Sequence, residues 1–465
     1  MDVLALPWTG PLQVPLAAAA TPADFMAARM QMAFTLGVHI VFACFGIGLP
    51  ALTVFAEWRG IRTGDPHYLL LARRWAKAMG VLFAVGAVSG TILSFEMGTL
   101  WPRFMAAFGP AIGLPFAIEG IAFFVEAIFL GIYLYGWDRL PPKVHVLTGI
   151  PIVLGGLASA FFVVTVNAFM NDPAGIRVED GRVVEVRPLA AMLNQAMPTQ
   201  TSHMIVAAFL VASFGVASVY AVAMLRGRRD RYHRLGLILP FTVGAVLAPV
   251  QLLIGDLAAR YVADHQPAKF AAMEGVLRTE AGAPFHLGGI VDGDRMRFAV
   301  EIPNGLSLLL RFDPDAVIRG LDSIPPDAQP PVAVVHLSFQ VMVGIGTLLM
   351  GLAAWFALTW WRRRDLPRSP WFLRLTAVSG VLAAIALEAG WVTTEVGRQP
   401  WIVHGVMRTA DAVNPNPGLT TGLYVVLAVY AVLVTATVVV LRRMTRSRPV
   451  PPRVVREEAD SYAVV

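Results

Sequence analysis

At residues 390–401 the chain reads GWVTTEVGRQPW, and this stretch ends a long apolar run that also contains Glu388. Two carboxylates, an arginine and two tryptophans therefore lie within, or at the edge of, a segment apolar enough to cross a bilayer. An ionisable side chain costs free energy in that environment, so its presence there favours a functional role. The composition of the rest of the chain indicates the same environment.

The composition is that of a membrane protein. The 465 residues are 56% hydrophobic and 15% charged, whereas a soluble protein carries about 25% charged residues. A helix needs about 20 residues to span a bilayer. Six runs of that size contain no Asp, Glu, Lys or Arg, at residues 30–56, 146–170, 204–225, 235–255, 337–361 and 418–441. Three more runs, 78–95, 104–135 and 375–394, have few charges, so the sequence predicts an all-α integral membrane protein with about nine transmembrane helices.

Basic residues occur mainly in alternate connections, after the first, third, fifth, seventh and ninth spans. The positive-inside rule assigns these connections to the cytoplasm. The N-terminus is then periplasmic and the C-terminus cytoplasmic. The net charge of +6 is explained by these connections, so it does not indicate a nucleic-acid partner.

The chain divides into five segments. Residues 1–25 form an external tail without the basic start of a signal peptide. Residues 26–255 hold the first six spans, and 337–442 hold the last three. Residues 256–336 between them form a long, proline-rich periplasmic loop, a type of segment that is often functional. Residues 443–465 form a basic cytoplasmic tail.

Candidate metal ligands are histidines, methionines and carboxylates, because Cys44 is the only cysteine. His39 lies about 15 Å into the first span, near the bilayer centre, where it could bind a haem or form a hydrogen bond to a neighbouring helix. His203 and Met342 lie near the external ends of the fifth and seventh spans. A His/Met pair is typical of a six-coordinate haem, although a methionine more often fills a gap in a core.

Paired carboxylates occur twice at a spacing of seven residues, as Glu119 and Glu126 in the third span and as Glu388 and Glu395 in the eighth. This spacing puts both members of a pair on one helix face, about 10 Å apart. In the third span this arrangement favours a proton relay. The alternative is structural pairing with a basic residue, but these spans contain almost none.

Several ordered motifs resemble subunit I of cytochrome bd-type quinol oxidases. GRQPW at residues 397–401 is the most specific of them. The others are RMQMAFT (29–35) leading to His39, FEMGTLW (95–101), AIEG (117–120), GWDRL (136–140) and NAFMNDP (167–173).

The resemblance implies three haems. His203 and Met342 would ligate a low-spin haem b. His39 and Glu395 would each serve one of two high-spin haems, a haem b and either a haem d or a third haem b, without the sequence indicating which serves which. Gln340 stands where many members have an arginine, which resembles the cyanide-insensitive branch and should lower the potential of the low-spin haem.

The remaining roles also follow from the resemblance. Trp391 and Arg398 are expected at the cofactors. Glu119 is expected at the dihaem site and Glu126 on a proton path from the cytoplasm. The quinol would be bound by two residues of the external loop, Lys269 and Glu274.

The implied enzyme is an electrogenic quinol oxidase of aerobic respiration in the bacterial inner membrane. It would oxidise ubiquinol or menaquinol at the periplasmic side and reduce O2 to water with cytoplasmic protons, generating a membrane potential without pumping. Its partners would be a second membrane subunit and, in some members, a small single-helix subunit. The rivals are a haem–copper oxidase, a bis-histidine cytochrome b, and a secondary transporter with a carboxylate proton relay and no haem.

Overall fold

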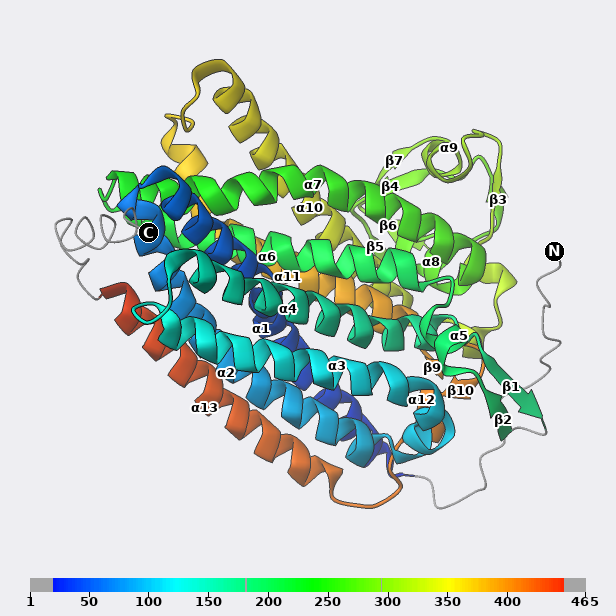
Figure 1. Cartoon of the computed structure of the whole chain (residues 1–465). Coiled ribbons are helices and arrows are strands. Elements are labelled where there is room, and N and C mark those ends of the chain that lie inside the picture. Colours follow the sequence, from blue (N-terminus) through cyan, green and yellow to red (C-terminus); the bar gives the residue numbers. More distant parts are fainter. Residues whose placement is uncertain (1–19, 180–181, 294, 447–465) are drawn as a thin grey trace.

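A bundle of long helices makes up most of the protein (Figure 1). The computed structural model describes residues 20–179, 182–293 and 295–446. Within these residues nine helices are long and apolar enough to cross a membrane, as expected from the sequence. They are α1 (Pro22–Thr63), α2 (Pro66–Leu100), α3 (Pro102–Gly136), α4 (Pro142–Asn171), α6 (Met197–Leu225), α7 (Arg231–His265), α10 (Val332–Arg363), α11 (Pro370–Gly397) and α13 (Leu419–Arg446). The prediction of an all-α membrane protein with nine spans is therefore confirmed for the described part of the chain.

The long helices begin and end at local signals in the sequence. Thr21 accepts a hydrogen bond from the backbone N–H of Asp24 and so caps the start of α1. Gly64 ends α1 with a φ of 66°, a left-handed conformation that glycine adopts without strain. Proline occupies one of the first two positions in α1, α2, α3, α4, α6 and α11, where its missing N–H costs nothing.

Short elements gather at one end of the bundle (Figure 1). The short helices are α5 (Pro188–Met192), α8 (Pro267–Glu274), α9 (Gly305–Arg311), α12 (Thr409–Ala412), η1 (Leu321–Ser323) and η2 (Pro326–Ala328). Five antiparallel pairs are β1 (Ile176–Glu179) with β2 (Arg182–Val186), β3 (Glu280–Ala281) with β8 (Val317–Ile318), β4 (Phe285–Leu287) with β7 (Val300–Ile302), β5 (Ile290–Asp292) with β6 (Arg295–Arg297), and β9 (Trp401–Val403) with β10 (Met407–Arg408). We call this end of the bundle the loop end.

The long polar loop differs in extent from the expectation. Helix α7 continues to His265, so residues 256–265 are helical and the loop begins about three turns later. The loop also has a small hydrophobic core, in which Phe270 and Val276 pack with Leu306 and Ile318. Most of the two tails expected from the sequence, at residues 1–19 and 447–465, lies outside the described residues.

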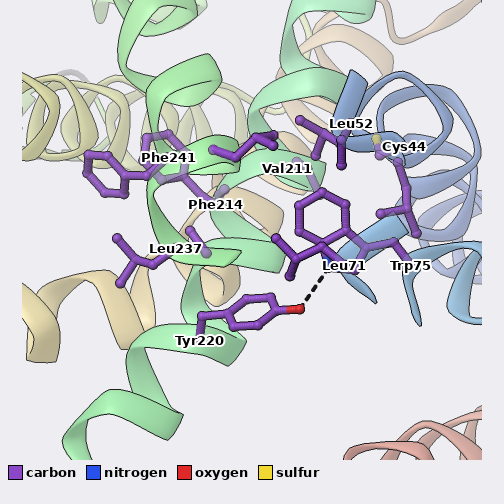
Figure 2. Packing of buried hydrophobic residues seen from close by; sticks show 14 of the residues in the cluster. Cys44, Leu52, Leu71, Trp75, Val211, Phe214, Tyr220, Leu237 and Phe241 are labelled. Carbon is purple, nitrogen blue, oxygen red and sulfur yellow. Dashed lines mark hydrogen bonds between the residues drawn. The ribbon is translucent and has the colours of Figure 1, made fainter. Parts of the chain in front are cut away.

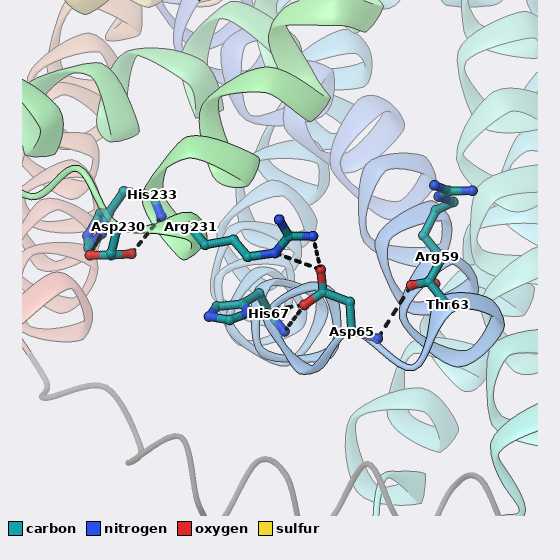
Figure 3. Close-up of polar contacts among 7 residues, drawn as sticks. All are labelled: Arg59, Thr63, Asp65, His67, Asp230, Arg231 and His233. Atoms are coloured by element: carbon teal, nitrogen blue, oxygen red, sulfur yellow. Dashed lines mark hydrogen bonds and ion pairs between the residues drawn. The ribbon is translucent and has the colours of Figure 1, made fainter. Parts of the chain in front are cut away.

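The opposite end of the bundle (Figure 1) carries the basic connections, and we call it the basic end. Figure 3 shows polar contacts at this end. Asp65 accepts hydrogen bonds of 2.9 and 2.6 Å from Arg231 and one of 3.0 Å from the backbone N–H of His67. Burial would raise the pKa of Asp65, but the hydrogen bonds from Arg231 and His67 outweigh it and the pKa is lowered. Asp230 caps α7 in the same way, by accepting a bond from the N–H of His233. These contacts join the α1–α2 turn to the start of α7.

The largest hydrophobic cluster packs α1, α2, α6 and α7 together (Figure 2). Cys44 and Leu52 of α1 contribute to it, and Phe214 and Phe241 meet edge to face with ring centroids 5.5 Å apart. Helix α1 approaches α6 closely at Gly48, because glycine has no side chain. A Cβ atom added there would lie only 2.5 Å from the Cβ of Ala212. Trp75 of α2 donates a 2.9 Å hydrogen bond to the buried hydroxyl of Tyr220 on α6. The Tyr220 hydroxyl is therefore satisfied within the core.

Candidate functional site

His203 and Met342 lie in the part of the bundle formed by α6, α7, α10 and α11, where α7 and α11 each pack against both α6 and α10. The ring of His203 lies against Gly255, at which an added Cβ would come within 3.4 Å of Cε1. An added Cβ at Gly390 would come within 2.9 Å of the Met342 sulfur. His203 Nδ1 is buried and has no hydrogen-bond partner within the described chain. Glycines of neighbouring helices thus let both side chains pack closely against the helix backbone, and the donor atoms of these side chains suit haem iron.

His39 forms a hydrogen bond that fixes the roles of its two nitrogens. Its Nδ1 lies 2.8 Å from the hydroxyl oxygen of Ser89 on α2. The single hydroxyl proton of Ser89 is donated to the carbonyl of Gly86, at 3.0 Å. In this arrangement Nδ1 donates its proton to Ser89, and Nε2 of the neutral ring keeps a free lone pair. This is the tautomer that a haem-ligating histidine requires.

Glu395 accepts hydrogen bonds at both carboxylate oxygens. Asn167 of α4 donates to Oε1 at 2.7 Å, and Arg398 donates to Oε2. Arg398 also donates to Asn167 Oδ1 at 3.2 Å. The Arg398 side chain is almost fully buried, and its Nε lacks a partner among the described residues.

Asn171 extends this group to the loop that follows α7. It donates to Asn167 Oδ1 at 2.6 Å and accepts from Lys269 Nζ at 2.7 Å. Its backbone carbonyl accepts a further bond, of 2.8 Å, from Gln266. The aliphatic part of Lys269 lies against Gly397, where an added Cβ would come within 2.9 Å of Cγ. A continuous series of hydrogen bonds therefore joins Lys269 to Glu395.

The sequence interpretation gave Asn167 and Asn171 no role, although both belong to the NAFMNDP motif. Their spacing of four residues places them on one helix face, and this was the available signal.

His404, which follows β9, also lacked a role in the sequence interpretation. Its pKa is lowered to about 4 by burial and by the positive charges of Lys269 and Arg398. Burial, followed by the charge of Arg398, lowers the pKa of Lys269 to about 7, against the opposing effect of Glu395. His404 Nδ1 has no hydrogen-bond partner in the described part of the chain. Lys269 and His404 thus lie near Arg398, and Glu395 is the carboxylate near Lys269 and Arg398. Such a group of nitrogen-bearing side chains can bind a further carboxylate.

Glu274 is buried at the end of α8, and its Oε2 is without a hydrogen-bond partner within the residues described. Burial raises its pKa to about 8. Its backbone carbonyl lies 3.2 Å from Nδ1 of His286. Gln340 of α10 accepts a 3.0 Å bond from the N–H of Gly288 and donates a 3.1 Å bond to the carbonyl of His286. Gln340 therefore ties α10 to the segment that adjoins Glu274.

Glu126 of α3 faces α4 where two glycines allow a close approach. An added Cβ at Gly155 would lie 3.0 Å from Glu126 Cβ, and one at Gly156 would lie 3.7 Å from its Oε1. Glu126 is buried, whereas Glu119, two turns away, is half-buried.

The structure also shows the surroundings of Trp391 and of two further carboxylates, Glu388 and Glu96. Trp391 is partly buried and packs against the main hydrophobic cluster. Glu388 lies against Gly37 of α1, and its Oε1 has no partner within the described ranges. Glu96, which belongs to the FEMGTLW motif, is buried and accepts bonds of 3.0 and 2.9 Å from Gln31 and Thr35.

Comparisons with known proteins agree with this arrangement. Residues 27–449 match the family described as cytochrome bd terminal oxidase subunit I. A Bacillus subtilis (strain 168) chain provisionally named cytochrome bd menaquinol oxidase subunit I is 37% identical over 92% of this chain and 98% of its own length. The cytochrome bd ubiquinol oxidase subunit 1 of the same organism is 31% identical, over 87% of this chain and 89% of its own.

A solved structure shows the same fold. The structure of bd oxidase from Geobacillus thermodenitrificans superposes with a TM-score of 0.85 at 41% identity, over 92% of this chain and 99% of that one. The family match spans almost the whole length of the chain, and the resemblance inferred from the motifs is therefore confirmed. This protein belongs to the cytochrome bd terminal oxidase subunit I family.

Proposed function

We propose that the chain holds the haems and the quinol site of its oxidase, with quinol oxidation at the loop end and proton supply from the basic end. The family makes the chain the large subunit of a terminal quinol oxidase, a multi-pass membrane enzyme. The series of hydrogen bonds from Lys269 to Glu395 is the observation that supports this division. The secondary transporter is not favoured, because the family match covers residues 27–449.

Haem, when bound, supplies single-electron transfer and oxygen binding at its iron. His203 and Met342 would hold a low-spin haem b. His39 would hold one high-spin haem and Glu395 the other, one of them a haem b and the other a haem d or a third haem b. The free lone pair of His39 Nε2, the unpartnered Nδ1 of His203 among described residues and the glycines beside His203 and Met342 support this fit.

Haem also carries two propionate carboxylates, which need cationic or N–H partners in a buried site. Arg398 Nε and His404 Nδ1 are donors without a partner in the described chain, and both lie near Lys269. Arg398 and His404 would hold the propionates of the haem served by Glu395. Trp391, one residue after the glycine beside Met342, would line the space between the haems.

Quinol oxidation requires a hydrogen-bond donor and a proton acceptor. Lys269 would donate a hydrogen bond to a quinol oxygen, because its amine is held by Asn171 at 2.7 Å and keeps further donors. Glu274 would accept the quinol proton, since its Oε2 has no partner within the residues described. A pKa of about 8 lets Glu274 exchange protons near neutral pH. The names of the two Bacillus relatives make menaquinol or ubiquinol the candidate substrates.

Protons for water formation would be held by Glu126 and passed to Glu119 on the same face of α3. Quinol protons would be released at the loop end, in the periplasm, and protons for water taken from the cytoplasm at the basic end. The enzyme would then generate a membrane potential without pumping, in the bacterial inner membrane. Its partner would be subunit II, joined in some members by a small single-helix subunit.

The test is a reduced-minus-oxidised absorption spectrum of the purified complex, with pyridine haemochrome analysis and quinol-dependent oxygen uptake. We expect haem b with a red-shifted haem d band, or haem b alone if the third site holds haem b. A complex without haem, or one that consumes no oxygen with quinol, would contradict the proposed function.

A further inference from the structure

A buried polar triad, used by none of the roles above, lies at the basic end where α1, α3 and α4 meet. Glu57 belongs to the last two turns of α1, Tyr133 to the last turn of α3 and His145 to the first turn of α4. Their exposed fractions are 2%, 0% and 1%. Burying three such groups is costly unless each is hydrogen-bonded, so the contacts among them need an explanation.

Each member of the triad is bonded to the other two. The Tyr133 hydroxyl donates to Glu57 Oε2 at 2.5 Å, and His145 Nδ1 lies 2.7 Å from Glu57 Oε1. His145 Nε2 lies 2.9 Å from the backbone carbonyl of Tyr133. Both ring nitrogens of His145 thus face oxygen acceptors, and an imidazolium would satisfy both of them. The proton between Nδ1 and Glu57 can reside on either partner while the triad keeps the same total charge.

The triad is aligned with the carboxylates of the proposed proton path. Tyr133 follows Glu126 by seven residues on α3, as Glu126 follows Glu119. The three side chains therefore share one helix face at intervals of about 10 Å. Helix α4 contacts two of these side chains through glycines that are also seven residues apart. An added Cβ at Gly149 would lie 3.2 Å from the Tyr133 ring, and one at Gly156 would lie 3.7 Å from Glu126 Oε1.

Helix α1 supplies a hydroxyl group in the interval between Glu57 and Glu126. Gly46 lies at the same height in the bundle as Glu126, because both are close to Gly156. A Cβ added at Gly156 would lie 3.3 Å from the Gly46 carbonyl oxygen and 3.7 Å from Glu126 Oε1. Thr53 lies seven residues after Gly46 and four before Glu57, on the same face of α1. Its hydroxyl is fully buried and donates to the carbonyl of Leu49 at 2.8 Å. It is the polar group of α1 closest in sequence to Glu57 on this face.

We propose that Glu57, Tyr133 and His145 form a proton relay that loads Glu126 from the basic end of the bundle. His145 gives its Nδ1 proton to Glu57 Oε1. The Tyr133 hydroxyl takes a proton from Glu57 Oε2 as it releases its own, the Thr53 hydroxyl exchanges a proton in the same way, and the released proton reaches Glu126. A proton taken up at the basic end then restores His145. The Trp137 ring packs against His145, with ring centroids 4.3 Å apart. This relay rests on the proposed use of Glu126 in oxygen reduction.

The test uses Tyr133→Phe, Glu57→Gln and Thr53→Val in the purified complex, with Tyr220→Phe as the control. Tyr220 is also a buried tyrosine with a bonded hydroxyl, but its partners are Trp75 and Tyr232 rather than a carboxylate. The readouts are haem content, steady-state oxygen uptake, the solvent deuterium isotope effect, and proton uptake after the reduced complex is mixed with oxygen. A structural role would not alter the isotope effect.

We expect Glu57→Gln and Tyr133→Phe to retain haem, to slow proton uptake and turnover by about tenfold or more, and to increase the isotope effect. Thr53→Val should act in the same direction, and Tyr220→Phe should leave both quantities unchanged. Wild-type turnover and isotope effect in Tyr133→Phe and Glu57→Gln would overturn the relay, and so would loss of haem in both, which would assign the triad a structural role. If instead the wild-type complex lacks haem or quinol-dependent oxygen uptake, the proposed function itself fails.

Discussion

Lys269 Nζ lies 2.7 Å from Asn171 Oδ1, and this bond joins the loop after α7 to the end of α4. Asn171 in turn donates to Asn167, which donates to Glu395. If a bound quinol displaced Lys269, the movement would therefore shift Asn171, Asn167 and Glu395 through these three hydrogen bonds.

Asn171→Ala should weaken the use of quinol. The substitution leaves a buried amine without its acceptor, and a hydrogen bond to a charged group contributes about 1.5–3 kcal/mol, so kcat/KM for quinol should fall roughly 10- to 100-fold. Asn194→Ala is the matched control, because Asn194 is also buried but caps the start of α6 through the N–H of Met197. That control should lower thermal stability and leave kcat/KM unchanged. An unaltered kcat/KM in Asn171→Ala would exclude the role of this bond.

Glu274 should set the pH dependence of quinol oxidation. Because burial raises its pKa to about 8, the carboxylate that can accept a proton forms only as pH rises through this value. The turnover at saturating quinol should rise over the same range, and Glu274→Gln should abolish this dependence. Glu280→Gln, at an exposed position on β3 of the same loop, is the control. A dependence that survives in Glu274→Gln would assign it to another group.

The same pKa shift predicts the effect of pH on stability. The folded-state pKa of Glu274 is above its ordinary value of 4.5, so the folded protein binds more protons than the unfolded chain between these two values. Its contribution to stability is full below pH 4.5 and is lost as pH rises through about 8. Thermal melts of wild type and Glu274→Gln should therefore differ most above pH 8. Parallel melting curves at all pH values would contradict the shift.

Met342→Leu should convert the low-spin haem to a high-spin form, since leucine offers no donor atom and leaves His203 as the only axial ligand. The change is read from the absorption and electron paramagnetic resonance spectra. Met350→Leu, on the same helix, is the control. It should leave the haem low-spin, because the spin change requires loss of the ligand and not merely of a methionine from α10. A retained low-spin spectrum in Met342→Leu would remove Met342 from the iron.

Gln340→Arg should raise the potential of the low-spin haem, because a nearby positive charge favours the reduced state. Arginine also cannot accept the bond that Gln340 takes from the Gly288 N–H. Gln340→Met separates the two effects, since it removes the bonds without adding a charge. Redox titration should show an upward shift in Gln340→Arg alone. Equal potentials in both variants would show that the charge is not felt at the haem.

Glu395→Ala and Glu395→Gln together test the carboxylate as a ligand. Gln retains an oxygen that can accept from Asn167 or Arg398, whereas Ala retains none. Loss or perturbation of a high-spin haem in both variants is expected if the carboxylate binds iron. Loss in the Ala variant alone would mean that Glu395 only holds Asn167 and Arg398 in position.

The transmembrane bundle could be predicted from the sequence because charge depletion is a local property. Runs such as residues 204–225 identify a span without reference to any other part of the chain. The prediction of nine spans therefore holds among the described residues, although helices such as α1 and α7 extend beyond the apolar runs into polar sequence. Caps and polar helical turns, which hydropathy does not register, account for the difference.

The contacts within the candidate site depend on long-range packing and could not be predicted in the same way. Asn171, Lys269 and His404 come from three segments that are far apart in sequence, and only the packed bundle brings them together. Glu57 and His145 are 88 residues apart and look, in sequence, like ordinary polar residues near the ends of spans. The motifs indicated several candidate ligand and proton-transfer residues, but they did not indicate the hydrogen bonds that connect these residues.

The shortness of the connections has a consequence for how the protein is made. Only Gly64 and Asp65 separate α1 from α2, and only Trp101 separates α2 from α3. Links of this length allow each helix only an antiparallel place beside its neighbour. The contact between His39 and Ser89 is therefore made within the first 100 residues of the chain, and it needs none of the segments that carry His203 and Met342.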